Sequence, residues 1–445
     1  MSRCAVALSG GGHRAALFGL GVLLYLADAG KSREVTSVAS VSGGSLTNGY
    51  VAQSVDYASV SGSAFWEAMR PLARQIANRG TLWAAPLTWA YLALLASTGA
   101  AAAVGVWFLP VALPLRVVVF FAALLPVAWI AGWRGVVCAR AFASTLFRTG
   151  GRRSRLADMH ADVDHVLCAT DLHWGEHVYL SGRFVCAYRY GWGKPGDLSL
   201  ADAVQASAAY PGGFPARRLP TRRHGFALPA DERATTVRRL ALVDGGAYDN
   251  MADEWALGVG ERNARWAALA PALREPDELV VVNSSAPLDL RPLGKLRLPI
   301  VGEALTLKRD IDILYDTTTS TRRRWLVDTF RSGGRLRGAI VQISQSPFRV
   351  PTSFAVGEDA QAERARAMLD ALGDSGAAWD ARVERTRTVK TTLNRLGVRD
   401  AADLVHHGYV LAMANLHVLL DYPLLPLPSA ARFAELVGGN PEQVS

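Results

Sequence analysis

Cysteine is scarce in this sequence of 445 residues, and the cysteines it has are widely spaced. They are Cys4, Cys138, Cys168 and Cys186. The absence of a CxxC pair argues against a disulfide framework and a cysteine-bound metal, and indicates a reducing compartment. No His, Asp or Glu cluster has metal-ligand spacing either. We therefore expect no metal and no other cofactor.

Signatures of nucleic-acid binding are also missing. The net charge is +9 at pH 7, which suits anionic lipid headgroups or a nucleic acid. There is no zinc-finger spacing, no aromatic RNA-binding motif and no basic heptad region. We expect anionic membrane lipids rather than nucleic acid as partners. The first eight residues are too short for the apolar region of a secretory signal, so we expect none there.

Charge is absent from two long segments in the first third of the chain. Residues 82–109 contain no charged side chain, and residues 117–133 contain none. A membrane-spanning helix needs about 20 apolar residues. The first segment exceeds this length, and the second reaches it if it begins before Arg116 and that side chain extends to the membrane surface. Pro110 and Pro114 mark the turn of a predicted transmembrane hairpin.

Arginine is concentrated on both sides of this hairpin. Those before it are Arg70, Arg74 and Arg79, and those after it are Arg134, Arg140, Arg148, Arg152, Arg153 and Arg155. Because cytoplasmic flanks of membrane helices are enriched in Lys and Arg, both flanks are predicted to lie on the cytoplasmic side. The alternative is a pair of long core helices in a soluble protein.

Short β-prone runs alternate with helical patterns in the rest of the chain. Predicted strands cover 4–8, 35–41, 163–170, 184–190, 239–243 and 278–283, and predicted helices cover 13–29, 200–209, 358–372, 381–396 and 401–420. This alternation predicts a doubly wound α/β sheet. We expect residues 1–80 and 138–435 to build one α/β domain, interrupted by the hairpin at 81–137 and followed by a tail at 436–445.

A serine lies where the second predicted strand meets the next helix. The sequence from Ser40 through Ser42 to Gly43 and Gly44 is similar to the G-x-S-x-G nucleophile turn, with Ser40 in place of the first glycine. Such a turn pushes the serine hydroxyl out at the top of the sheet, and the helix N-terminus favours developing negative charge. Ser42 is therefore a candidate nucleophile. The alternative is an ordinary Ser/Gly turn after a buried strand.

Three consecutive glycines follow the first predicted strand. The N–H groups of Gly10, Gly11 and Gly12 can converge on one point and bind an oxyanion or a phosphate. Arg14 is expected either to add positive charge there, for an oxyanion or a headgroup, or to cap the surface or pair with a carboxylate. The segment also fits the dinucleotide-binding pattern G-x-G-x-x-A. The acidic residue that this pattern needs about 20 positions later is replaced by the serine turn.

Asp244 ends a predicted strand and is followed by Gly245 and Gly246. A carboxylate in this position reaches a site without steric obstruction and can serve as the base that a serine nucleophile needs. The alternative is a common Asp-Gly turn. No histidine stands in a recognisable triad context, so we expect Asp244 to be the base.

Together these motifs resemble the patatin-like phospholipase family, over residues 3–250. The resemblance rests on SGGGHRA at 9–15, the serine turn at 40–44, DGG at 244–246, and 203–215, which is similar to the family's ASxAxPxxFPP segment. It implies a three-layer α/β sandwich with a mostly parallel central sheet and a Ser-Asp dyad. Ser42 then attacks the acyl carbonyl, Asp244 accepts its proton, and the three glycine amides hold the oxyanion.

The sequence thus predicts a membrane-associated hydrolase of lipid carboxylic esters, of the phospholipase A or lysophospholipase type, with its catalytic domain on the cytoplasmic side. Two rivals come from other classes. One is a nucleotide-binding membrane protein that uses the glycine loop, and the other is a catalytically silent membrane scaffold of the same fold. A third keeps the enzyme but acts on a thioester, a protein or a small ester.

Overall fold

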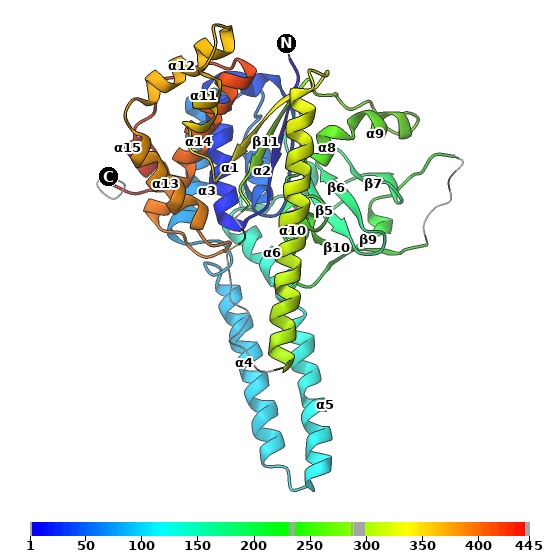
Figure 1. Ribbon diagram of the computed structural model, residues 1–445. Helices are drawn as coiled ribbons and strands as arrows, with labels where there is room; N and C mark the ends of the chain where they lie inside the picture. Colours follow the sequence, from blue (N-terminus) through cyan, green and yellow to red (C-terminus); the bar gives the residue numbers. More distant parts are fainter. Residues whose placement is uncertain (1, 231, 233–235, 286–287, 289–298, 441–445) are drawn as a thin grey trace.

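The computed structural model describes the chain except for residues 1, 231, 233–235, 286–287, 289–298 and 441–445 (Figure 1). Its centre is a ten-stranded mixed sheet with the order β12-β11-β1-β2-β5-β6-β7-β8, in which β10 pairs with β5 and β9. The strands are β1 (Cys4–Leu8), β2 (Val35–Ser40), β5 (Asp164–Asp171), β6 (Glu176–Ser181), β7 (Val185–Ala187), β8 (Gly191–Gly193), β9 (Arg217–Pro220), β10 (Arg239–Asp244), β11 (Glu278–Asn283) and β12 (Arg337–Gln342). The five strands from β12 to β5 run parallel, whereas the others pair antiparallel.

Helices cover both faces of this sheet. They are α1 (Gly12–Asp28), α2 (Gly43–Ser54), α3 (Gly62–Asn78), α7 (Leu200–Ser207), α8 (Glu254–Leu257), α9 (Val259–Arg265), α10 (Pro299–Arg331), α11 (Arg349–Phe354), α12 (Ala360–Leu372), α13 (Gly376–Thr388), α14 (Val398–Leu420) and α15 (Ala430–Val437). The α/β sandwich expected from the sequence is therefore confirmed. A two-stranded ribbon, β3 (Arg148–Thr149) with β4 (Arg152–Arg153), stands apart from the sheet.

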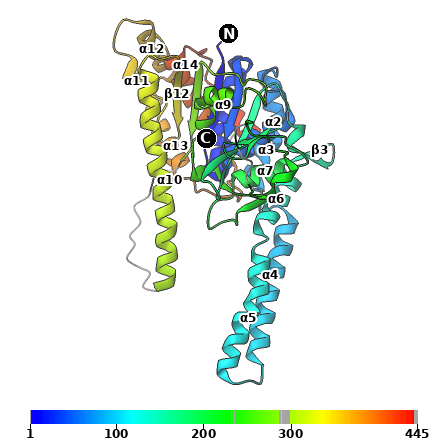
Figure 2. The same ribbon diagram turned by 90° about the vertical axis from the view of Figure 1, so that its right-hand side faces the viewer.

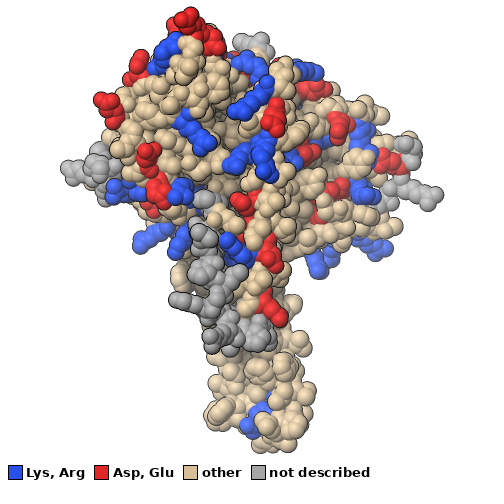
Figure 3. Space-filling view, viewed as in Figure 1, with Lys and Arg blue, Asp and Glu red and all other residues tan. Residues whose placement is uncertain are grey.

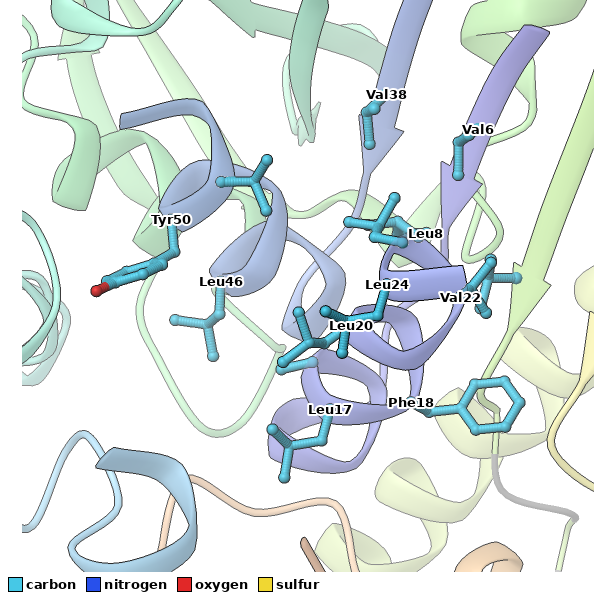
Figure 4. Packing of buried hydrophobic residues seen from close by; sticks show 14 of the residues in the cluster. Val6, Leu8, Leu17, Phe18, Leu20, Val22, Leu24, Val38, Leu46 and Tyr50 are labelled. Carbon is cyan, nitrogen blue, oxygen red and sulfur yellow. The ribbon is translucent and has the colours of Figure 1, made fainter. Parts of the chain in front are cut away.

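The apolar runs of the central strands are explained by burial on both faces. In β1, Val6 and Leu8 join the core beneath α1, α2 and α14, while Ala5 and Ala7 join the core beneath α8, α9 and α10. Side chains of a strand alternate between its two faces, so a strand covered on both sides is apolar throughout. Figure 4 shows Leu8 beside Leu20 and Leu24 of α1.

The uncharged segments form a helical hairpin that projects from the domain (Figure 1). It consists of α4 (Pro86–Trp107) and α5 (Leu113–Ala131), and α6 (Arg134–Thr145) leads back into the domain. In their most apolar stretches the two helices are 11% and 6% buried, and both are long and apolar enough to cross a membrane. Core helices would be buried, so these two helices do not form a core pair within the described part of the chain. Composition and exposure both suggest membrane association.

The second helix of the hairpin begins earlier than its uncharged segment. It starts at Leu113, with Pro114 in the first turn, where a missing N–H breaks no helical hydrogen bond. Arg116 therefore lies inside the helix, and its Nη2 donates to the carbonyl of Leu109 at 2.9 Å. In the space-filling view the shaft is uncharged apart from a basic group at its tip (Figure 3).

Other boundaries differ from the sequence-based expectation. The helix predicted over 381–396 ends at Thr388, and the following residues form a loop held by backbone bonds, from His13 N to Thr392 O and from Thr81 N to Leu393 O. The strand expected over 184–190 is limited to Val185–Ala187, and no element was predicted for β6, α10 or β12. Long-range contacts thus determined these segments more than local preference did.

Candidate active site

Ser42 lies on a strained turn between β2 and α2. Its backbone φ is 52° and its ψ is −116°, in a region that residues with a side chain rarely adopt. The turn is held by the Ser42 N–H, which donates to the carbonyl of Ser207 at 3.1 Å and lies 3.2 Å from the Ser207 hydroxyl. This is the conformation that presents a serine hydroxyl above a sheet.

The two glycines after Ser42 are required by close backbone contacts. A Cβ on Gly43 would lie 2.0 Å from the carbonyl oxygen of Gly12, and one on Gly44 would lie 2.6 Å from the carbonyl oxygen of Leu8. Both obstacles are backbone atoms, which cannot rotate away. The turn therefore packs directly against the glycine loop and the end of β1.

Ser40, which replaces the first glycine of the motif, has a structural role. Its hydroxyl is fully buried, accepts from Nδ2 of Asn48 at 2.9 Å and lies 3.0 Å from the hydroxyl of Ser45. Ser45 in turn lies 2.8 Å from the hydroxyl of Ser207. A small polar residue is accommodated because this hydrogen-bond network lies beneath the turn.

Asp244 is at the end of β10 and is buried, with 2% of its surface exposed. Its Oδ1 accepts from the N–H of Gly246 at 2.8 Å, and its carboxylate lines the same cavity as Ser42. Burial raises the pKa of Asp244 to about 7, and the Gly246 N–H and the Ser42 side chain act against that rise. A carboxylate of this kind can take up and release a proton near neutral pH.

The topology of β5 explains why residues so distant in the chain meet. Along one edge of β5, Leu167 pairs with Ser40 at the end of β2, and Ala169 pairs with Asp244 at the end of β10. Because β2 is parallel to β5 and β10 is antiparallel to it, the two strands end facing each other. Ser42 and Asp244 follow from these two ends.

Two of the three amides predicted for the oxyanion hole have no hydrogen-bond acceptor in the described part of the chain. The N–H of Gly10 donates to the carbonyl of Asn250 at 3.0 Å, which removes Gly10 from the predicted oxyanion hole. Among the described residues, the N–H groups of Gly11 and Gly12 have no acceptor, and neither has that of Gly43, directly after Ser42. Gly43 was considered only as part of the turn, although the residue after a nucleophilic serine commonly supplies such an amide.

Arg14 is buried beside this loop with 2% of its surface exposed. Its Nε donates to the carbonyl of Ser284 at 3.0 Å and its Nη1 to that of Val389 at 2.6 Å. Burial lowers its pKa to about 10, which leaves it protonated near neutral pH. In the described part of the chain it forms no salt bridge, so the alternatives of a surface cap or a carboxylate pair are wrong. A Cβ on Gly11 would lie 3.1 Å from Nη2, which places the positive charge next to the loop.

These groups line a cavity of about 800 Å³, a size typical of ligand sites. Its apolar walls include Leu46, Leu82, Trp83, Phe214 and Tyr315, and charged residues on its border include Lys308, Asp312, Asp316, Arg387 and Lys390. No histidine lines the cavity in the described part of the chain. The mixture of apolar wall and charged border suits an amphipathic ligand.

The remaining candidate groups are structural. His13, next to the glycine loop, contacts the carbonyl of Asn394 and the hydroxyl of Thr81, and burial lowers its pKa to about 4. Across the described ranges, no three His, Cys, Asp or Glu side chains form a group that could hold a metal ion. All four cysteines are buried and free.

Comparison with known proteins gives a family match and similarities to solved structures. A family model described as patatin-like phospholipase matches residues 6–252, more than half of the chain. Human GIVD cytosolic phospholipase A2 is similar with 15% identity and a TM-score of 0.39, over 64% of this chain and 46% of that one. VipD from Legionella pneumophila is similar with 12% identity and a TM-score of 0.26, over 98% of this chain and 90% of that one. The chain thus spans less than half of the human protein's length, and no curated protein sequence matches it.

Proposed function

The chain belongs to the patatin-like phospholipase family, and from this premise we propose that it is a membrane-associated serine lipid acyl hydrolase with Ser42 as nucleophile and Asp244 as base. Family membership supports lipid ester hydrolysis. The observation that carries the assignment of residues is that Ser42, on its strained turn, and the buried carboxylate of Asp244 line the same cavity, where the Ser42 side chain lowers the pKa of Asp244 against the effect of burial. A serine on a strained turn, beside a base of pKa about 7, can be activated as a nucleophile.

The reaction proceeds in two halves. In the first, the Ser42 oxygen attacks the ester carbonyl while Asp244 accepts its proton, and the alcohol leaves with that proton. The N–H groups of Gly11 and Gly12 face the negative charge on the carbonyl oxygen, and the guanidinium of Arg14 stabilises it electrostatically. In the second half, Asp244 deprotonates a water molecule, which attacks the acyl-enzyme. The bond between the acyl carbon and the Ser42 oxygen then breaks, Asp244 returns the proton to that oxygen, and the fatty acid leaves.

The hairpin holds this site at the membrane. In the proposed arrangement residues 81–137 are an insertion whose helices α4 and α5 lie in the bilayer, and the α/β domain is built from residues 1–80 and 138–435. Arginines flank both ends of the hairpin, so the positive-inside rule puts the domain on the cytoplasmic side, facing anionic headgroups. A lipid substrate is then always close to the cavity.

Fluorophosphonate labelling of the full chain in membranes tests the proposal. Wild type should become covalently labelled and Ser42→Ala should not, whereas Ser285→Ala, which alters another serine of the cavity, should still label. Asp244→Asn should lose turnover of phospholipid esters and keep its fold, measured by circular dichroism.

Two results would overturn the proposal. One is normal lipid hydrolysis by Asp244→Asn, which would remove the dyad. The other is an unlabelled but folded wild type. In that case, binding of ATP or NAD would support the nucleotide-binding alternative, and the lack of both activities would support a silent scaffold.

A further inference from the structure

Helix α10 extends beyond the α/β domain on the same side as the hairpin. In two views at right angles, its N-terminal end projects past the domain in the direction of α4 and α5 (Figures 1 and 2). The cavity lies between the two projections. Leu82 and Trp83, just before α4, line one side of it, and Lys308, Asp312 and Tyr315 of α10 line another.

The composition of α10 changes along its length. Its first nine residues, 299–307, contain a single charged residue, Glu303. Leu305 and Leu307 in this part are 42% and 63% exposed. The next nine residues, 308–316, carry five charges. Exposed leucines in a nearly uncharged end, followed by a charged zone, are the pattern of a helix that enters a membrane surface.

The C-terminal half of α10 is fixed to the domain. Leu326 is fully buried in the core, and Arg322 donates to both carboxylate oxygens of Asp253, at 3.2 and 2.7 Å. The side chain of Asp253 is fully buried. The position of the apolar end is therefore set by the domain.

The two views show how far that end reaches relative to the hairpin. The N-terminal end of α10 extends past the start of α4 in both of them (Figures 1 and 2), and Lys308 of α10 and Trp83, just before α4, line the same cavity. At about 1.5 Å per residue, residues 299–307 extend roughly 13 Å beyond Lys308. If the bilayer begins at the foot of α4, this end reaches the boundary between headgroups and acyl chains.

We propose that residues 299–307 of α10 are a second membrane contact, and that this end and the foot of the hairpin frame a portal through which the lipid ester passes from the bilayer to Ser42. The inference rests on the proposed function. A long acyl chain that left the bilayer through water would expose all its methylene groups. Between α10 and the hairpin it stays covered by the apolar walls at Leu46, Leu82 and Phe214.

The contact is apolar rather than electrostatic. In α10 up to Asp316, acidic residues outnumber basic ones, so attraction to anionic lipids cannot hold this end at the surface. Lys308 is paired with Asp312 at 3.0 Å, and Asp312 also accepts from the Tyr210 hydroxyl at 2.8 Å. The contribution of Leu305 and Leu307 should therefore not depend on salt.

A pair of substrates and a matched variant test the portal in the full chain. Replacing Leu305 and Leu307 together by Asp should lower hydrolysis of long-chain phosphatidylcholine in vesicles by about tenfold, while hydrolysis of soluble p-nitrophenyl butyrate stays within about twofold. The control is Trp325→Asp, on the fixed half of α10, where the side chain is 52% exposed. It should leave both rates unchanged. A double variant that hydrolyses the vesicle lipid at the wild-type rate overturns the proposal.

A measurement without catalysis separates the portal from the proposed function. The four native cysteines are buried, so Leu307→Cys can be labelled selectively with an environment-sensitive nitrobenzoxadiazole probe in the Ser42→Ala background. On phosphatidylcholine vesicles its emission should shift to the blue, and that of a probe at Trp325→Cys should not. A probe at Leu307→Cys that stays in water overturns the membrane contact, whereas failure of esterase activity in wild type would overturn only the catalytic assignment.

Discussion

At the scale of residues, the site depends on glycines, because their missing Cβ atoms let backbone segments approach closely. Ser42 can take its strained conformation only because the backbone of the glycine loop comes up against the turn. Gly43 is the contact point between them. The sequence showed a run of small residues here, but the distances that make each glycine necessary are a property of the folded chain.

We expect Gly43→Ala to abolish serine labelling and to destabilise the domain. The new methyl group would lie 2.0 Å from the Gly12 carbonyl oxygen, and relief of such a contact by backbone movement costs about 1–3 kcal/mol or more. Thermal unfolding and fluorophosphonate labelling measure the two effects. Gly376→Ala is a suitable control, because a Cβ there meets nothing within 4 Å. An active and stable Gly43→Ala would show that the turn does not need this contact.

The pH dependence of activity should report Asp244. The base must be ionised to accept the proton of Ser42, and burial raises its pKa to about 7. We therefore expect kcat/KM for a soluble ester to increase with pH, about tenfold per unit below that pKa, and to reach a plateau above it. A profile that is flat between about pH 5 and 8 would contradict Asp244 as the titrating base.

The same pKa predicts how stability changes with pH. An unfolded Asp ionises near the model value of 3.8, and the folded Asp244 ionises near 7. Between these values the folded state binds more protons, so the free energy of unfolding decreases as pH rises. In Asp244→Asn this carboxyl group no longer titrates. The free energy of unfolding of the variant, relative to that of wild type, should therefore increase by up to about 4 kcal/mol from acid to neutral pH. Chemical denaturation at the two pH values measures the difference.

At the scale of elements, the sequence predicted what depends on neighbours in the chain. The strand and helix that flank the glycine loop end close to where composition placed them, because glycines interrupt both. The loss of Gly10 from the oxyanion hole could not be foreseen, since its acceptor is the carbonyl of Asn250. The loop after Thr388, predicted as helix, is determined by bonds to residues 13 and 81. Both cases depend on contacts between distant segments.

Helix α10 was missed for a related reason. Its exposed leucines, its charged zone and its buried residues follow one another along the helix and do not form one regular stripe, so no single periodicity marked it. Within the arginine triplet 322–324 of this helix the roles differ. Arg322 pairs with Asp253 and Glu254, whereas the side chain of Arg324 contacts the neighbouring Thr321 at 3.5 Å.

This contrast gives a prediction within three consecutive residues. Arg322→Met leaves the buried carboxylates of Asp249 and Asp253 without their guanidinium, and we expect it to lower the free energy of unfolding by about 3 kcal/mol. Arg324→Met should change it by less than about 0.5 kcal/mol. Urea denaturation of both variants in detergent provides the measurement. Equal effects would mean that Arg322 does not fix α10 to the domain.

At the scale of the whole molecule, the parts beyond the family match complete the site. The match ends at residue 252, yet α14 packs on α1 in the main core, and the loop from Val389 to Asn394 lines the cavity. Arg14 is held partly by the carbonyl of Val389. Residues after 252 thus help to hold Arg14, which belongs to the SGGGHRA motif at 9–15.

The arrangement of the whole chain in a membrane is the last prediction. If α4 and α5 span the bilayer and the domain is cytoplasmic, the turn between them faces the opposite side. A cysteine at Val111 should then react with a membrane-impermeant maleimide only from outside intact cells or vesicles, and Thr149→Cys, on the exposed β3 strand, only after permeabilisation. The native cysteines give little background because all are buried. Reaction of both positions from the cytoplasmic side alone would mean that the hairpin enters the membrane without crossing it, and would leave Ser42 and Asp244 untouched as the proposed dyad.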